Sequence, residues 1–204
     1  MGLNVDETWE ALLNGVSGAG PITHFDASQF KTQFACEVKN FDPTLYLDKK
    51  EVRKFDRYAQ FAVAAAKEAV GDSALDLEKV DKNRVGVIFA AGIGGIRTFE
   101  EEVGGYFTNI ERGPKFNPFF IPKMIADIAA GHISMIYGFH GPNYATVSAC
   151  ASSTHSLIDA FNNIRLGKAD VIVTGGAEAA ISVAGIGGFN AMHAISTRNE
   201  DPQT

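Results

Sequence analysis

The sequence is poor in cysteine, in basic charge and in long hydrophobic runs. Its two cysteines, Cys36 and Cys150, cannot form a disulfide framework or a four-thiolate metal site within the chain, so we expect a reducing compartment. Eighteen basic residues against 24 acidic ones give a net charge of −6, which disfavours a nucleic-acid-binding surface. No apolar window reaches the roughly 18 residues that a membrane span needs, and the first residues lack a signal-peptide pattern. We therefore expect a cytoplasmic protein that binds neither nucleic acid nor a membrane.

The 204 residues are 46% hydrophobic, which is enough to bury a sizeable core. The spacing of apolar residues predicts a helix over 51–70 and another over roughly 123–137. Short β-branched runs predict buried parallel-type strands at 84–91, ended by the flexible GIGG of 92–95, and at 169–180. Strands that alternate with helices indicate an α/β layered fold. No cluster of metal-ligating residues has ligand spacing, so we expect neither a metal nor a bound cofactor.

Both ends of the chain have the pattern of a truncation. The sequence opens almost directly into a helix, with Asp6 as its expected cap, whereas α/β domains of this kind usually open with a buried strand. It closes on the polar stretch STRNEDPQT, where another element would be expected to follow. The alternative is that residues 202–204 form an ordinary exposed terminus.

The most informative stretch spans 143–178. Residues 145–148 are predicted as a strand and 153–166 as a helix, which places Cys150 at the strand-to-helix junction. A thiol at a helix N-terminus lies near unpaired N–H groups and the positive end of the helix dipole, and both favour the nucleophilic thiolate. Small neighbours leave room for an acyl thioester, and the backbone N–H of Cys150 could help to hold an oxyanion. The alternative is a small buried packing residue, as most free cysteines are; Cys36, which has no such junction, is interpreted as structural.

Six motifs together resemble the condensing enzymes of the β-ketoacyl-[acyl-carrier-protein] synthase II family. The resemblance is collinear from about residue 5 to the end, and the motifs are GIGG at 92–95, NPFFIP at 117–122, AGHISMIYGFHGPN at 130–143, the SACASS elbow at 148–153, ADVIVTGGAE at 169–178 and GIGGFNAMHAISTRN at 185–199. It implies a thiolase-like layered α/β fold, α-β-α-β-α in the full enzyme and made of two related halves. Residues 1–204 would form most of the first half, an amino-terminal β-ketoacyl synthase domain truncated at both ends.

The resemblance also implies an activity and a pocket. Such enzymes transfer an acyl group from acyl carrier protein to the cysteine, here Cys150, and then condense it with malonyl-acyl carrier protein with loss of carbon dioxide. Ile93 and Phe120 match positions that line the acyl pocket, and Phe189 matches a pocket residue close to the nucleophile. From the residues alone, Ile93 could equally be a turn spacer, and Phe120 and Phe189 could be core packing residues.

Partners are implied in the same way. Lys50, Arg53 and Lys54 match a basic patch that meets the acidic carrier protein, although a solvated helix start is the alternative for KKEVRK. His193 stands where a relative has an arginine facing the carrier, which weakens the contact on that side. The family forms homodimers in which the strand near 169–176 pairs across the two-fold axis, although the hydrophobic run VIVTGG is equally compatible with an internal strand.

The family's two catalytic histidines and its lysine belong to a second half, so this length of chain alone is expected to be inactive in condensation. The local histidines offer no substitute. His155 lies five residues after Cys150, about 140° round a helix, and so points elsewhere. His132 and His140 are interpreted as structural, and neither His24 nor His193 has a recognisable spacing to the elbow.

Three other functions compete with this one. A dinucleotide-binding enzyme is disfavoured because Arg97 occupies the position of the third glycine of GxGxxG. A catalytically silent partner subunit, of the chain-length-factor type, would usually lack the cysteine that this chain retains. A degradative thiolase would act on coenzyme A esters, whereas the basic patch and the GFHGPN context favour synthesis.

Overall fold

The structure is a computed structural model that describes residues 1–203. The chain forms two compact units. The larger unit runs from Pro43 to Ala179, and the smaller one combines Met1–Asp42 with the chain from Ala180 onward. Among the described residues, no helix is both long and apolar enough to cross a membrane.

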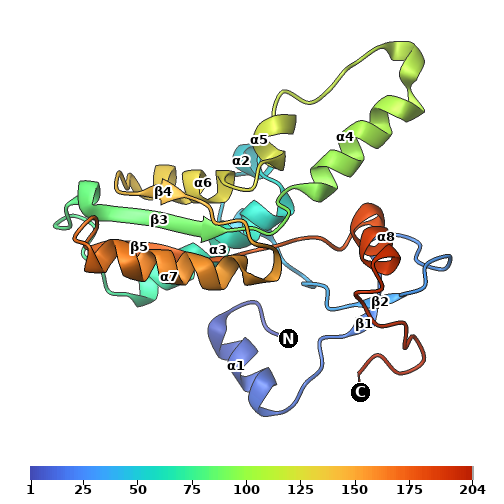
Figure 1. The fold of residues 1–204 in the computed structure, drawn as a ribbon, viewed down its shortest axis with the longest axis horizontal. Helices are drawn as coiled ribbons and strands as arrows, with labels where there is room; N and C mark the ends of the chain where they lie inside the picture. The colour runs from blue at the N-terminus through green and yellow to red at the C-terminus, as the bar shows by residue number, and fades with distance from the viewer. Residues whose placement is uncertain (204) are drawn as a thin grey trace. The chain divides into compact units, whose positions relative to one another are not determined.

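A parallel sheet forms the centre of the larger unit (Figure 1). Its strands are β3 (Val85–Ala90), β4 (Asn143–Tyr144) and β5 (Val171–Gly176), in the order β4-β3-β5. Every residue of β3 is buried, as expected for a strand with neighbours on both edges and helices on both faces. The predictions of strands within 84–91 and 169–180 are confirmed.

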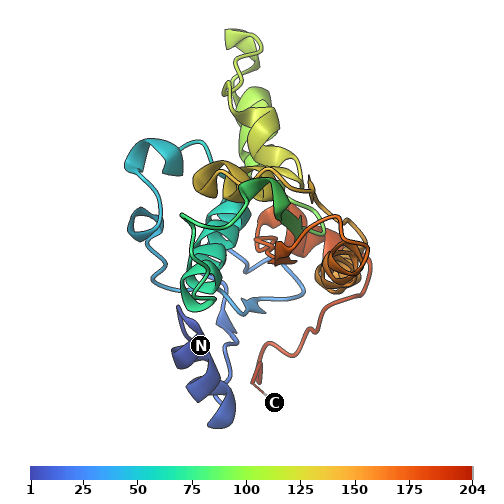
Figure 2. The same cartoon turned by 90° about the vertical axis from the view of Figure 1, so that its left-hand side faces the viewer.

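Helices cover both faces of this sheet. The helices α3 (Arg57–Asp72) and α6 (Ile128–Tyr137) pack on one face, and α7 (Ser152–Arg165) contacts β3 and β5 from the other (Figure 2). Side chains alternate along β3, so that every second residue points towards α3 and α6. The core there consists of buried apolar side chains from β3, α3 and α6, among them Val85, Val87, Phe89, Ala59, Ala62, Val63, Ala129, Ala130 and Ile133.

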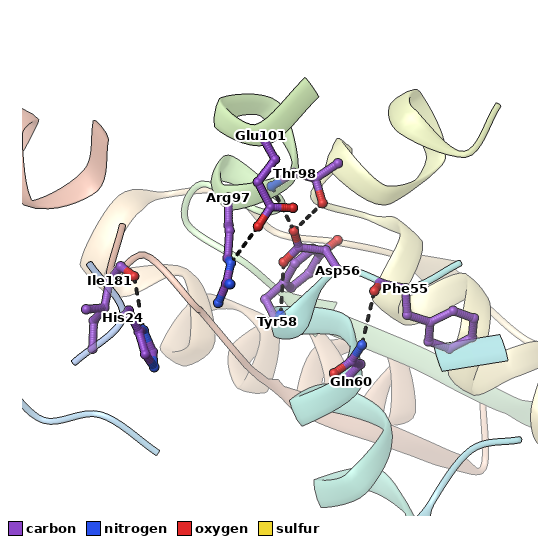
Figure 3. A network of polar contacts seen from close by, with 9 residues as sticks. All are labelled: His24, Phe55, Asp56, Tyr58, Gln60, Arg97, Thr98, Glu101 and Ile181. Carbon is purple, nitrogen blue, oxygen red and sulfur yellow. Dashed lines mark hydrogen bonds and ion pairs between the residues drawn. The ribbon is translucent and has the colours of Figure 1, made fainter. Parts of the chain in front are cut away.

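The helix predicted over 51–70 is two helices. The short α2 (Lys49–Val52) ends before a turn, and α3 begins after Asp56, whose side chain accepts a hydrogen bond from Tyr58 N–H. Gln60 Nε2 donates to the carbonyl oxygen of Phe55 at 3.2 Å (Figure 3). It also donates to the carbonyl oxygen of Val52 at 3.1 Å, and so satisfies groups that the break would leave unpaired. The break is thus stabilised by side-chain partners that replace the interrupted helical bonds.

Asp56 also joins α3 to α4 (Ile96–Thr108). Its carboxylate is 3% exposed and accepts bonds from Thr98 N–H at 3.2 Å and Thr98 Oγ1 at 2.5 Å (Figure 3). Nearby, Tyr58 donates its hydroxyl proton to Ile125 O at 2.5 Å. Burial, together with the charge of Asp56, raises the pKa of Tyr58, so that the phenol stays protonated and remains a donor.

The segment between α4 and α6 differs from the prediction. The stretch 116–122, expected as a loop, contains the first residues of α5 (Phe120–Met124), and the helix predicted from 123 starts only at Ile128. Ile125 is extended, with φ −67° and ψ 139°, which interrupts the helical path. Phe120 stacks on Phe116 with ring centres 5.5 Å apart, and this aromatic contact holds α5 against the preceding loop.

The smaller unit contains α1 (Val5–Leu13), α8 (Val183–Ala191) and a short antiparallel pair, β1 (Gly20–Pro21) and β2 (Phe34–Ala35). The cap of α1 is Asn4, whose side chain accepts from Glu7 N–H, and not Asp6, which lies in the first turn. In this unit Asn190 Nδ2 donates to Thr32 Oγ1 at 2.8 Å, which ties α8 to the chain before β2. Short 3-10 turns complete the chain at Pro43–Leu45, Lys82–Arg84, Ile110–Arg112 and Ala149–Ala151.

Candidate active site

Three chain segments that follow the three parallel strands meet at one edge of the sheet. They are the glycine turn 92–95 after β3, the elbow 148–151 after β4, and Glu178 after β5. A Cβ atom on Gly92 would lie 3.0 Å from Glu178 Oε2 and 3.4 Å from Ala149 O, so the absence of a side chain allows this close approach. The carboxyl ends of parallel strands are where α/β proteins commonly place their ligand sites.

Cys150 is the middle residue of the 3-10 turn Ala149–Ala151. This turn comes directly before α7, which begins at Ser152. The thiol is free and exposed, so the alternative of a buried packing cysteine is wrong for this residue. Ala149 has φ +53°, a left-handed conformation that costs a non-glycine residue about 1–2 kcal/mol. Cys36, expected to be structural, is also free and exposed, so it is the elbow and not exposure that distinguishes Cys150.

The side chain of Ser152 holds the elbow in this strained conformation. Its hydroxyl accepts from Ser148 N–H at 2.9 Å and donates to Ala149 O at 2.6 Å. Thr146 Oγ1 donates to Ser152 O at 2.8 Å, so the chain just before the elbow is bonded to α7. The strand predicted at 145–148 is wrong, because β4 ends at Tyr144. Thr146 and Ser148 bond to Ser152 and not to a neighbouring strand.

His155 contacts the elbow as well. Its Nδ1 lies 2.6 Å from Ser148 Oγ, within hydrogen-bonding distance. The helical spacing from Cys150 could not predict this contact of His155. Ser148 precedes the helix, and its position depends on the bend at Ala149. The bond gives α7 a second attachment to the residue that begins the elbow.

Glu178 holds the glycine turn. Its Oε2 accepts from Ile93 N–H at 2.7 Å and its Oε1 accepts from Gly94 N–H at 3.2 Å. On the other side of the turn, Gly95 N–H donates to Met124 O at 3.0 Å, and Gly94 adopts φ +83°. Sequence reasoning gave Glu178 no role, because the residue lies within the run 169–180 that was predicted as a strand, whereas β5 ends at Gly176.

The residues expected to line a pocket lie on different elements. Ile93 is the second residue of the glycine turn and its side chain is 43% exposed. Phe120 begins α5 and also lies 6.3 Å from Phe99, measured between ring centres. Phe189 belongs to α8, in the smaller unit. The structure thus places Ile93 beside the elbow through Gly92, and Phe120 on the short helix that bonds to the same turn.

The expected basic patch lies around α2. Lys50 is in that helix, Arg53 follows it, and both side chains are exposed. Lys54 differs, because its Nζ forms an ion pair with Glu51 at 2.6 Å and lies 5.8 Å above the ring of Phe119. Lys50 and Arg53 therefore present the more accessible positive charges.

Two of the other histidines, His132 and His24, have structural surroundings. His132 stacks on Phe55 with ring centres 3.6 Å apart, and burial lowers its pKa to about 4. His24 Nδ1 lies 3.3 Å from Ile181 O within the smaller unit (Figure 3). Over residues 1–203, no group of three or more His, Cys, Asp or Glu side chains is arranged to hold a metal ion.

Comparison with known proteins gives one family. The family whose sequence model matches residues 1–204 is described as "Beta-ketoacyl synthase, N-terminal domain". The chain is 44% identical over 203 residues to 3-oxoacyl-[acyl-carrier-protein] synthase 2 of Coxiella burnetii, covering 100% of this chain and 49% of that protein. It is 43% identical over 204 residues to the protein of the same name from Vibrio harveyi, covering 100% and 48%. The chain thus spans about half the length of these curated relatives.

Solved structures share the fold. A beta-ketoacyl synthase from Burkholderia phymatum superposes with a TM-score of 0.83 at 25% identity, covering 97% of this chain and 48% of the other. A structure described as "The ishigamide ketosynthase/chain length factor" gives a TM-score of 0.80 at 27% identity, covering 96% and 48%. The expected thiolase-like α/β fold, present as the amino-terminal half of a longer enzyme fold, is confirmed.

Proposed function

The chain belongs to the beta-ketoacyl synthase family, as the match of its amino-terminal domain to residues 1–204 shows, and on that premise we propose that Cys150 is the acyl-accepting nucleophile of a fatty-acid condensing enzyme. The observation that carries the proposal is the exposed thiol at a strained elbow directly before α7. The names of the curated relatives support 3-oxoacyl-[acyl-carrier-protein] synthase as the activity of the whole protein.

The proposed reaction has two steps. In the first, the Cys150 thiolate attacks the carbonyl of an acyl-carrier-protein thioester, a new S–C bond forms as the carrier's S–C bond breaks, and the carrier leaves as its thiolate, which takes up a proton from water. The backbone N–H of Cys150, in the turn before α7, and N–H groups at the start of that helix would stabilise the negative charge on the oxygen. In the second, malonyl-acyl carrier protein loses carbon dioxide, its carbanion attacks the Cys150 thioester, and the new C–C bond forms as the S–C bond breaks and Cys150 is released as a thiolate.

The pocket and the carrier surface complete the proposal. Ile93 and Phe120 would line the acyl pocket, and the position of Ile93 beside the elbow supports this role. Phe189 is included on its match to the family's pocket residue alone. The exposed charges of Lys50 and Arg53, with a smaller contribution from the paired Lys54, would attract the acidic acyl carrier protein.

A homodimer is part of the same proposal. Within the described residues, β5 lies at an edge of the sheet and pairs with β3 only, so its other edge has backbone groups that could pair across a two-fold axis. Two free cysteines agree with a reducing compartment, and we assign the protein to the cytoplasm on that ground.

A silent partner subunit is the second candidate, because one of the similar solved structures is described as a ketosynthase with a chain length factor. The retained and exposed thiol favours the active enzyme. The two candidates differ in whether an acyl group can be transferred to this chain at all.

The test is acyl transfer to the natural full-length polypeptide. We expect incubation with a long-chain acyl-carrier protein to add one acyl group, and peptide mass mapping to place it on Cys150. A Cys150→Ala variant should gain no acyl group, whereas Cys36→Ala, which removes the other exposed thiol, should be acylated like the unchanged protein. Absence of an adduct on the unchanged protein would favour the silent partner.

A further inference from the structure

Glu178 is an exposed residue whose carboxylate is bonded to the backbone of another segment. It follows β5 by two residues and is exposed, yet both carboxylate oxygens are occupied by the turn after β3. Oε2 accepts from Ile93 N–H at 2.7 Å and Oε1 from Gly94 N–H at 3.2 Å. Two bonds from consecutive N–H groups to one carboxylate fix the orientation of a peptide segment better than a single bond does.

The turn that Glu178 holds is wedged between the elbow and α5. The contacts on the elbow side come through Gly92, where a Cβ would meet Ala149 O at 3.4 Å. On the α5 side, a Cβ on Gly94 would meet Met124 O at 2.8 Å, and the φ of Gly94 is +83°. The turn therefore has a close fit that depends on glycine at these positions, and Glu178 is the side chain that anchors its central peptides.

We propose that Glu178 is a positioning residue that fixes Ile93 relative to the Cys150 elbow and thereby sets how well long acyl chains are accepted. The proposal rests on the proposed function, in which Cys150 carries the acyl group and Ile93 lines its pocket. Glu178 itself touches the turn and acts on the acyl group only through Ile93.

The expected effect depends on acyl length. A butanoyl group occupies only the surroundings of the thiol, whereas a tetradecanoyl group must run along the pocket lining, where the Ile93 side chain lies. Without Glu178, water can occupy the place of the carboxylate and accept from the same N–H groups, so the fold should persist while the turn loses its fixed orientation. Misplacement of a positioned group by a small distance commonly slows a reaction by one or two orders of magnitude.

The experiment measures single-turnover acylation of the natural full-length polypeptide by butanoyl- and tetradecanoyl-carrier protein, followed by intact mass. Alkylation by iodoacetamide reports the reactivity of Cys150 without using the acyl pocket, and it is read on the Cys150 peptide by mass mapping because Cys36 is also exposed. Glu178→Ala removes both acceptors, and Glu178→Gln keeps one. Glu78→Ala is the matched control, because Glu78 is an exposed carboxylate before β3, at the opposite end of that strand from the turn.

We expect Glu178→Ala to slow tetradecanoyl transfer at least about tenfold, with butanoyl transfer and alkylation within about twofold of the unchanged protein. Glu178→Gln should lie between the two, and Glu78→Ala should match the unchanged protein. An equal loss for both acyl lengths, or no loss for either, overturns the positioning role. If the unchanged protein accepts neither acyl group, the proposed function fails instead, so the two failures are distinguishable.

Discussion

The hydroxyl of Ser152 donates a hydrogen bond to the carbonyl oxygen of Ala149 at 2.6 Å, and the thiol-bearing Cys150 lies between the two in the chain. The same hydroxyl accepts from Ser148 N–H, so one side chain bonds both residues that precede the nucleophile. Ala149 is left-handed, and these bonds offset the cost of that conformation.

Ser152→Ala should therefore disturb the elbow. The side chain is 3% exposed, so its removal leaves the Ser148 N–H without this partner, at a cost of about 1–3 kcal/mol in the free energy of unfolding. Acylation of Cys150 should also slow by about tenfold or more, because the thiol is no longer held in one position. Urea unfolding and acyl transfer measure the two effects. Ser153→Ala, at an exposed neighbour, is the control, and an equal response of both variants would contradict the role of Ser152.

Asp56 offers a test of the break between α2 and α3. Asp56→Ala removes the cap of α3 and the acceptor for Thr98 N–H and Oγ1, and should lower the free energy of unfolding by about 2–4 kcal/mol. Asp48→Ala is a matched control, because Asp48 also precedes a helix but forms no side-chain cap bond there. We expect it to change stability by less than about 0.5 kcal/mol in chemical unfolding. Comparable losses in the two variants would refute this account of the cap.

His132 predicts a pH dependence of stability. Burial lowers the pKa of His132 to about 4, against an ordinary value of about 6.5, while Glu51 raises it and Lys54 lowers it by smaller amounts. The unfolded chain binds the proton at a higher pH than the folded one. The free energy of unfolding that the neutral His132 preserves is therefore fully present above about pH 6.5 and is lost as the pH falls towards 4. Thermal unfolding between pH 7.5 and 4.5 measures it.

In that experiment His132→Phe should lose less stability than the unchanged protein as the pH falls. The phenylalanine ring can still stack on Phe55 but does not titrate. His140→Gln, at an exposed histidine, should leave the slope unchanged. An unchanged slope in His132→Phe would assign the acid sensitivity to other groups.

The basic residues around α2 should differ in how much each contributes to binding an acidic carrier protein. Lys50→Glu and Arg53→Glu should each weaken binding of an acidic carrier protein by several-fold at low salt, with a smaller effect at higher salt because exposed charges are screened. Lys54→Glu, which changes the charge by the same amount, should have less effect, because Glu51 already pairs with Lys54 at 2.6 Å. Lys168→Glu, at the end of α7 away from the elbow, serves as the charge control in titrations followed by calorimetry or fluorescence anisotropy. Equal effects of Lys50→Glu and Lys168→Glu would point to net charge and not to a local surface.

Local sequence patterns were enough to predict the parallel strands β3 and β5, the helix α7 and the place of Cys150 before that helix. Each of these follows from a short run of neighbouring residues, where β-branched apolar side chains favour a buried strand and apolar residues on one face favour a helix. The motifs around them were also sufficient to indicate the family, which the match over residues 1–204 confirms.

The breaks between elements and the bonds that hold the site depend on contacts between residues that are distant in the sequence. The break before α3 depends on Asp56 and Thr98, which are 42 residues apart in the sequence, and the glycine turn depends on Glu178, which is 85 residues from Ile93. The bond from Glu178 forms because parallel strands bring their carboxyl ends to one edge of the sheet, and no local pattern records which side chain will face which backbone group there. The strained backbone at Ala149 likewise exists because Ser152 bonds to both sides of it, a relationship that residue types alone do not reveal.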